Sequence, residues 1–324
     1  MRIGFLSFIL AVLVFSGPVF ANHGGLHSGP STALIAEQSD TNDYSVYYQP
    51  YITKFKQKAK DGLAADTTIT HGHTFGIIRN FDKNFKAGFE AILTRSKTDG
   101  DQISFGFTVP DKFSLNSYEL RALAEYTFMG VTIKPSVQLG LDDYKQQRRD
   151  IFSGLTAFSK TSGWHLQGEI EAWSDFLVHD FILLRPIAGL EYTYTKAKGY
   201  TETGAGFFNL AVGPVNDNRL ISKLGLTAAV LIPDGTGGTI APFASIEWLH
   251  NFNTNPFTAN VTFIPGPSLG KTNLFAGPDA NGARINAGIF LQTKSGLDFY
   301  VAYQGEFFKN STSHTAAASV GFSF

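Results

Sequence analysis

The chain has 324 residues, with 30 Phe, 33 Gly, no Cys and a formal net charge of -1. Charged residues make up only 16% and aromatic residues 14%, yet the mean hydropathy is -0.02. This balance excludes a polybasic nucleic-acid-binding protein, and the lack of Cys excludes disulfides and thiolate metal sites. The aromatic content argues against a disordered chain, and the mean hydropathy is too low for a helical membrane protein. The apolar residues are therefore numerous but dispersed.

The first 21 residues have the composition of a secretory signal peptide. Arg2 gives the segment a positive start, an apolar stretch follows, and small residues precede Ala21. A Gly-Pro pair ends the apolar stretch before it is long enough to span a bilayer as a helix. The sequence therefore predicts a signal peptide at 1–21, an N-terminal arm at 22–43 and one domain at 44–324.

The dominant pattern after the arm is an alternation of apolar and polar residues. In the segment 118–128, every even position is apolar or aromatic, and the odd positions include Glu119, Arg121 and Glu125. Successive side chains of a strand point to opposite faces, so one face of this strand is apolar and the other is charged. The segment 131–141 repeats the pattern after a two-residue link, which predicts a tight hairpin.

The same alternation occurs at 85–93, 220–230 and 297–307. Strands that are apolar on one face and polar on the other are typical of transmembrane β-barrels. A β-sandwich would produce similar alternation, so the connections between strands have to decide between the two folds.

Short and long connections alternate along the chain, which favours an all-β, transmembrane, up-and-down antiparallel barrel of about 12 strands. In a β-sandwich with Greek-key connections, short and long connections are not expected to alternate. The expected short connections lie near 80–84, 129–130, 178–180, 233–238 and 294–296, and the expected long ones near 57–67, 96–116, 145–162, 196–218, 251–283 and 309–313.

The last segment alternates up to the C-terminal residue. Val320, Phe322 and Phe324 fall in one phase. A strand of this kind would close the barrel against the first strand and leave no edge unpaired in lipid. Phe322 and Phe324 resemble the terminal signal that the outer-membrane barrel-assembly machinery reads.

The C-terminal two-thirds of the chain resembles the autotransporter β-domain, the translocator barrel of type V secretion, whereas residues 44–180 match it mainly by strand rhythm. The resemblance rests on the order of four segments, at 184–192, 200–206, 220–226 and 241–250, followed by the final Gly-Phe-Ser-Phe. It implies a twelve-stranded outer-membrane barrel in a Gram-negative bacterium. Family members carry a long passenger before the barrel, whereas only the arm at 22–43 intervenes here. We therefore expect a barrel that does not export a passenger, and the arm is either a short lumenal helix or a disordered segment.

Charged residues of both signs are expected to line the lumen. The alternation places on the inward face Glu119, Arg121, Glu125, Lys134, Glu169, Glu171, Arg185, Glu191, Lys223, Glu247, Arg284, Asp298 and Glu306. Because acidic groups are in excess, an open pore would prefer cations. The alternative interpretation is that these charges brace the interior of a plugged barrel, since a twelve-stranded lumen is narrow.

One acid/base pair at the barrel rim deserves a test. His165 begins a strand that follows Asp142 and Asp143 across a loop, as an omptin-like rim enzyme would require. Solvated polar residues at a barrel rim are the more ordinary explanation. The sequence otherwise predicts no catalytic residue, no cofactor and no metal site.

These features predict an outer-membrane barrel that acts as a pore or a structural barrel. A surface adhesin or receptor that uses the loops near 96–116, 196–218 and 251–283 is the alternative, and a rim enzyme is the second alternative. The expected partners are outer-membrane lipids and lipopolysaccharide, the barrel-assembly machinery, and a host or surface ligand, without nucleic acid.

Overall fold

A computed structural model describes residues 44–60, 63, 65–104, 107–150, 153–264, 266 and 268–324. The predicted signal peptide and the predicted N-terminal arm, with its lumenal helix, lie outside the described residues. Among the residues that the structure describes, no helix has the length and the apolar character needed to cross a membrane.

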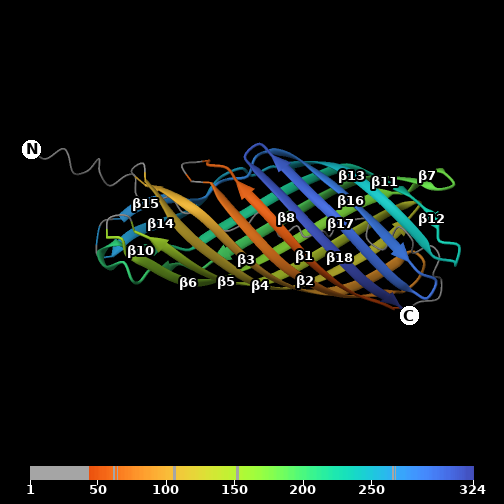
Figure 1. Cartoon of the computed structure of the whole chain (residues 1–324), viewed down its shortest axis with the longest axis horizontal. Coiled ribbons are helices and arrows are strands. Elements are labelled where there is room, and N and C mark those ends of the chain that lie inside the picture. Colours follow the sequence, from red (N-terminus) through yellow and green to blue (C-terminus); the bar gives the residue numbers. More distant parts are fainter. Residues whose placement is uncertain are drawn as a thin grey trace, which may run out of the picture.

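Twelve long strands form one closed antiparallel barrel (Figure 1). Each strand pairs with the next along the chain, and β1 pairs with β18 to complete the circle. This arrangement confirms the predicted up-and-down barrel and the predicted strand number. The wall strands are β1 (Tyr44–Gln57), β2 (Asp66–Asn80), β3 (Phe85–Ser104), β4 (Phe107–Phe128), β5 (Val131–Arg149), β6 (Thr156–Ser174), β8 (Ile182–Ala197), β11 (Val215–Val230), β13 (Thr239–Asn251), β16 (Asn281–Gln292), β17 (Leu297–Phe308) and β18 (Ser311–Ser323).

The alternation in the sequence separates the two faces of the wall. In β4, Tyr118 and Leu120 are 55% and 59% exposed, whereas Glu119 and Arg121, at the alternate positions, are buried. An exposed apolar outer face and a buried charged inner face reverse the arrangement of a soluble protein. This is the arrangement that a strand needs when its outer side meets lipid.

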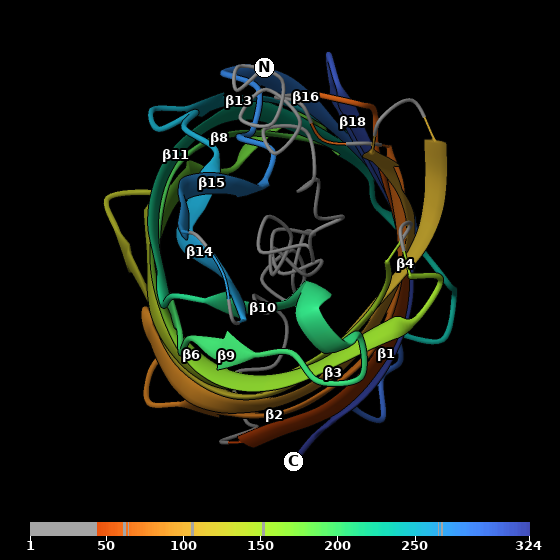
Figure 2. The ribbon, with the colours of Figure 1, turned by 90° about the vertical axis from the view of Figure 1, so that its left-hand side faces the viewer.

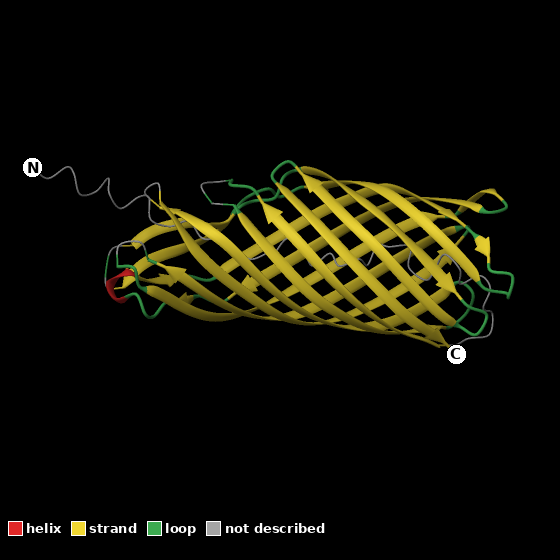
Figure 3. Cartoon of the chain, in the orientation of Figure 1, coloured by secondary structure: helices red, strands yellow, loops and turns green. Residues whose placement is uncertain are grey.

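Short turns connect the strands at one end of the barrel, which we call the turn end (Figure 3). Met129 and Gly130 form a two-residue turn with φ of 50° and 78°. Positive φ at both positions matches the primed turns that suit the twist of a hairpin. The short strands β7 (Phe176–His179) and β12 (Ile232–Pro233) also lie at the turn end, together with the C-terminus (Figure 1).

Two hairpins at the opposite end, the loop end, are longer than the sequence predicted. The expected loop at 96–116 is wrong, because β3 continues to Ser104 and β4 begins at Phe107. The connection expected at 145–162 is also shorter than predicted, because β5 continues to Arg149 and β6 begins at Thr156. The inner face of β4 changes from charged to apolar here, with Phe113 and Leu115 buried. The alternation of apolar and polar residues is therefore lost in this part of β4, and the sequence pattern predicted a loop there.

The two longest connections fold together into a second, four-stranded sheet at the loop end. It contains β9 (Tyr200–Thr201), β10 (Asn209–Val212), β14 (Phe257–Ile264) and β15 (Ser268–Phe275), with a 3-10 turn at Gly206–Phe208. Figure 2 shows β10, β14 and β15 within the outline of the barrel. We call this sheet and its 3-10 turn the loop cap.

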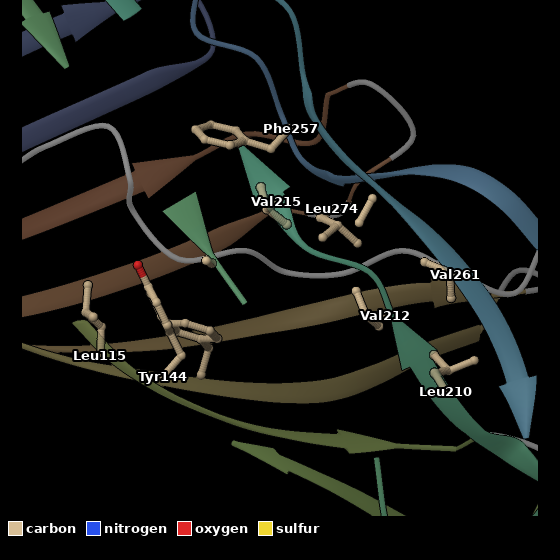
Figure 4. Close-up of a cluster of buried hydrophobic side chains, with 11 residues drawn as sticks. Leu115, Tyr144, Leu210, Val212, Val215, Phe257, Val261 and Leu274 are labelled. Atoms are coloured by element: carbon tan, nitrogen blue, oxygen red, sulfur yellow. The ribbon is translucent and has the colours of Figure 1, made fainter. Parts of the chain in front are cut away.

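The loop cap packs on the inner wall through a buried apolar cluster (Figure 4). Leu210 and Val261 of the cap are fully buried, and Leu115 of the wall is 1% exposed. The complete cluster is Phe113, Leu115, Tyr144, Ala197, Leu210, Val212, Val215, Phe257, Ala259, Val261 and Leu274. Burial of this many apolar side chains holds the two connections against the wall.

Candidate functional site

Lys223 of β11 is the centre of a buried ion network inside the barrel. Its ammonium group contacts Glu169 of β6, lies 3.0 Å from Glu191 Oε2 of β8 and 3.7 Å from Glu171 Oε1 of β6. One cation thus holds three carboxylates that would otherwise repel one another. The network joins three neighbouring strands across the inner face of the wall.

Arg284 of β16 forms a second ion cluster. Its Nη1 donates to Glu247 Oε2 at 3.0 Å, and its Nε donates to Glu306 Oε1 at 2.9 Å. Asn286 donates to Glu247 Oε1 at 3.0 Å, and Gln304 donates to Glu306 Oε1 at 3.2 Å. The guanidinium therefore bridges two carboxylates on the two strands that flank its own.

Arg121 of β4 is the centre of the third cluster. Its Nη1 donates to Glu90 Oε2 at 3.1 Å, and its Nε donates to Gln138 Oε1 at 2.9 Å. The Gln138 amide in turn donates to Glu119, and the Tyr47 hydroxyl donates to Glu90. Hydrogen bonds of this kind satisfy polar groups that the narrow interior removes from water.

The remaining predicted interior residues lie closer to the ends or between these clusters. Glu125 is 3.6 Å from Lys86, and Arg185 Nε is 2.6 Å from Asp175 Oδ1. Lys134 is half-buried and pairs in register with Glu171, while Asp298 is 7% exposed at the start of β17. All thirteen predicted side chains are buried or half-buried in the wall. Their role in lining a conducting lumen stays a prediction.

The structure brings His165 and Asp142 together. His165 Nδ1 lies 3.0 Å from Asp142 Oδ2, which also accepts the Tyr144 hydroxyl at 3.1 Å, while Asp142 Oδ1 accepts the Ser117 hydroxyl at 2.7 Å. The His165 side chain is fully buried and its ring covers Gly140, where a Cβ atom would approach Cε1 to 2.0 Å. The pair is therefore enclosed by the wall.

Arg148 of β5 fastens the loop cap to the wall, and no local motif in the sequence pointed to this residue. Its Nε donates to Glu202 Oε1 at 2.9 Å, and its Nη2 donates to Glu202 Oε2 at 2.5 Å and to the Phe208 carbonyl at 2.8 Å. Glu202 Oε2 also accepts the Leu210 backbone N–H at 3.0 Å. Both charged residues are 2% exposed, so the pair is a buried bidentate bridge.

Asp279 joins two other connections at the loop end. It accepts Lys60 Nζ at 3.0 Å, the Asn310 backbone N–H at 2.7 Å and the Asn310 side-chain amide at 2.7 Å. Burial opposes ionisation of this carboxyl, but the hydrogen bonds from Asn310 and Lys60 outweigh it and hold its pKa below the ordinary value. The loops around the cap are thus tied by an ionised group.

Comparison with known proteins relates this architecture to one family. The model of the "Autotransporter beta-domain" family matches residues 46–304. Outer membrane protein B of Rickettsia japonica is 22% identical over 317 residues, which cover 93% of this chain and 18% of that protein. The chain thus spans less than a fifth of the length of this relative.

Solved structures agree on the fold. The translocator domain of the autotransporter NalP from Neisseria meningitidis is 15% identical, with a TM-score of 0.71 over 90% of this chain and 93% of that one. The β-domain of the Bordetella autotransporter BrkA is 13% identical, with a TM-score of 0.65 over 87% of this chain and 100% of that one. At these identities the similarity establishes a shared barrel fold.

Proposed function

The chain belongs to the autotransporter β-domain family, and from this premise we propose that its barrel is a narrow polar pore that its own loop cap closes at the outer mouth. The family assignment confirms the resemblance in the sequence and the predicted location in the Gram-negative outer membrane. Barrels of this family lie in lipid and are assembled by the barrel-assembly machinery. The absence of passenger export stays a prediction.

The packing of the loop cap is the observation that supports a closed outer mouth. In outer-membrane barrels, short turns face the periplasm and long loops face the outside. The cap therefore lies at the external mouth, where Leu210 and Val261 are fully buried against the wall. An apolar contact of this kind would have to separate before the mouth could widen.

The charge of the interior supports a preference for cations. Of the thirteen predicted inward residues, eight are acidic and five are basic, which leaves an excess of three carboxylates. Rings of carboxylates favour cations in membrane pores. The three ion clusters narrow the passage at the same time, because their side chains reach across neighbouring strands.

Recording the ion conductance of the refolded chain in planar bilayers tests the proposed pore. We expect low conductance from the wild type and several-fold higher, cation-preferring conductance when 199–213 and 253–279 are replaced by short Gly-Ser links. A matched control shortens the connection at 233–238, which lies at the turn end, and leaves conductance unchanged. Absence of conductance in both the wild type and the cap-deleted chain would reject the pore.

A surface-binding role is a second candidate that one observation favours. Phe207 of the 3-10 turn is 76% exposed and belongs to the loop cap, which packs on the inner face of the wall. Exposed aromatic side chains away from a lipid belt often contribute to interfaces. If the cap binds a host or surface ligand, Phe207→Ser lowers adhesion of cells that display the barrel. Unchanged adhesion would reject this role for the cap.

We further infer that His165 and Asp142 brace the wall and perform no catalysis. Both oxygens of Asp142 already accept hydrogen bonds from neighbouring side chains, and both residues are buried. A general base needs access to the proton that it removes. His165→Ala should therefore leave any surface hydrolase activity of the cells unchanged, whereas loss of such an activity would restore the rim-enzyme hypothesis.

A further inference from the structure

Basic side chains gather on the outer face of the wall in its loop half. The strands that carry most of them, β3 to β6, lie side by side in the wall (Figure 1). In the segments 95–99, 112–116, 143–149 and 158–162, the exposed basic residues on this face are Arg95, Lys97, Lys112, Lys145, Arg149 and Lys160. The acidic residues on the same face of these segments are Asp99 and Asp143, which leaves a net charge of plus four.

The register of the strands brings three of these lysines together. Lys145 of β5 lies directly opposite Lys160 of β6 and, on its other side, opposite Ser114 of β4. Ser114 in turn lies opposite Lys97 of β3. Neighbouring strands are about 4.8 Å apart, so the three flexible side chains can reach one shared point above Ser114. We call Lys97, Ser114, Lys145 and Lys160 the basic patch.

No carboxylate forms an ion pair with the basic patch in the part of the chain that the structure describes. The lysines that form ion pairs there are Lys60, Lys86 and Lys223. Like charges that lie directly opposite each other destabilise a sheet, so the pair of Lys145 and Lys160 weakens the wall unless an anion lies between them. The basic patch thus favours a negatively charged ligand.

The basic patch lies just beyond the lipid-facing band of the wall. On β5, every odd position from Val131 to Leu141 is apolar and exposed. At about 3.4 Å per residue and the usual tilt of barrel strands, this span rises about 25 Å, which is the height of the apolar band of an outer-membrane barrel. Lys145 lies four residues beyond Leu141, and Lys160 lies four residues beyond Trp164 of β6. The patch therefore meets the headgroup layer, and its apolar border meets the acyl chains.

The positive charge is confined to one side of the barrel. It continues to Lys54 and Lys56 of β1 and to Lys196 of β8, all of which are exposed. On β11, β13 and β16, the outward positions in the loop half carry neither lysine nor arginine among the described residues, and are Asn216, Asn218, Trp248, His250, Asn281 and Ala283. A charge that serves only to mark the membrane boundary would surround the barrel, whereas a one-sided charge indicates a particular ligand.

We propose that the basic patch binds the phosphate group of an outer-leaflet glycolipid, the phosphorylated headgroup of lipopolysaccharide. The phosphate accepts hydrogen bonds from the ammonium groups of Lys145 and Lys160 and from the Ser114 hydroxyl, and the acyl chains lie along Leu141 and Trp164. Clusters of lysine beside a membrane attract anionic lipids, and the loop end faces the outer leaflet. A soluble anion would not use the apolar border. This site does not depend on whether the barrel conducts ions.

Titration of diphosphoryl lipid A into the refolded full chain in detergent micelles, followed by native mass spectrometry, tests the site. We expect saturable binding with one tight site per chain. The double variant Lys145→Gln, Lys160→Gln should lose affinity by about tenfold or more, because both cations that face the phosphate are removed. The double variant Lys145→Arg, Lys160→Arg keeps both charges and should retain the binding.

The double variant Lys83→Gln, Lys294→Gln is the matched control, because it removes two exposed lysines at the turn end. It should leave the binding of lipid A unchanged. The heat-dependent shift in electrophoretic mobility verifies that each variant is folded. Lys160→Glu keeps the site testable if the glutamine double variant does not fold, because it turns a repelling cross-strand pair into an attractive one and should still weaken binding.

Three results would overturn the proposal. The first is the absence of saturable binding to the wild type, and the second is equal binding to a folded Lys145→Gln, Lys160→Gln. The third is an equal loss of affinity in the turn-end control, which would show that net charge alone attracts the lipid. Deacylated lipid A or inorganic phosphate that binds as tightly as lipid A would overturn the assignment to a lipid.

Discussion

Tyr44 and Phe324, the first residue of β1 and the last residue of the chain, exchange both of their backbone hydrogen bonds. The Tyr44 N–H donates to the Phe324 carbonyl at 3.0 Å, and the Phe324 N–H donates to the Tyr44 carbonyl at 2.8 Å. Their rings stack with 6.1 Å between centroids. The final residue of the chain is thus part of the seam that closes the barrel.

Two roles of the terminal aromatic residues can be tested separately: closure of the barrel and recognition as the assembly signal. Phe324→Ala keeps the backbone hydrogen bonds, so we expect refolding in detergent to be nearly normal by heat-modifiable mobility. If Phe322 and Phe324 are the assembly signal, the same change lowers insertion into the outer membrane of cells several-fold. Val320→Ala, which also lies on the exposed face of β18, is the control. Normal assembly of Phe324→Ala and Phe322→Ala would contradict the signal.

Lys223→Met should destabilise the barrel strongly. The change leaves Glu169, Glu171 and Glu191 close together without their cation. Removing one partner of a buried ion pair costs about 3–5 kcal/mol. Urea unfolding in detergent or lipid measures the free energy of unfolding, and Lys145→Met, at an exposed position of β5, is the control. A loss no greater than that of the control would show that the cluster contributes little to stability.

The double variant Lys223→Met, Glu171→Gln tests the cause of that loss. Because it removes one of the three mutually repelling carboxylates, it should recover part of the free energy that Lys223→Met loses. Recovery identifies charge repulsion as the cause, whereas no recovery would point to lost packing of the lysine side chain.

Gly140→Ala should lower stability through His165. A Cβ atom at this position would lie 2.0 Å from the imidazole Cε1, so the ring has to move away from Asp142. Overpacking of a buried site costs about 1–3 kcal/mol. Gly168→Ala is the control, since a Cβ atom there would meet no neighbour within 4 Å. Equal unfolding free energies for the two variants would exclude close packing of His165 on Gly140.

Acidification should loosen the loops that Asp279 joins. The pKa of the Asp279 carboxyl in the folded chain lies below its ordinary value. The stability that this carboxyl contributes is therefore complete at a pH above the ordinary pKa, and it is lost as the pH falls through the pKa of the folded chain. Hydrogen-exchange protection of the Asn310 N–H should decline over this range in the wild type. In Asp279→Asn it should be low and independent of pH, and the Gly154 N–H, bonded to the Asp150 carbonyl at 2.9 Å, provides the reference amide. Protection of Asn310 that persists to the lowest pH would contradict this account.

The strands of the wall were predictable because a strand that faces lipid on one side alternates apolar and polar residues. Tyr118 and Leu120 face outward and Glu119 and Arg121 face inward, so the local sequence contains the information that places the strand. The same rule failed at Phe113, where the inner face meets the loop cap instead of polar groups. An apolar residue at this position suits the contact with the loop cap, but it lies on the inward face, where the pattern of a membrane strand has polar residues.

The loop cap could not be predicted because its contacts join distant parts of the chain. Arg148 and Glu202 are separated by 54 residues, and neither lies in a motif. Strands β10 and β14 likewise pair residues that are distant in the chain, at Val212 and Val261. The sequence suggested that these connections bind a surface ligand, which stays a prediction, and the structure folds them on the inner wall.

Single-channel recording of Arg148→Met in planar bilayers tests the closed outer mouth most directly. The substitution removes the bridge to Glu202 and the bond to the Phe208 carbonyl, while the wall strands keep their pairing. The account predicts that the wild type stays at low conductance and that Arg148→Met opens to a several-fold higher, cation-preferring level. Arg149→Gln, the neighbouring exposed arginine, should behave as the wild type. Indistinguishable traces from the wild type and a folded Arg148→Met would contradict closure by the loop cap.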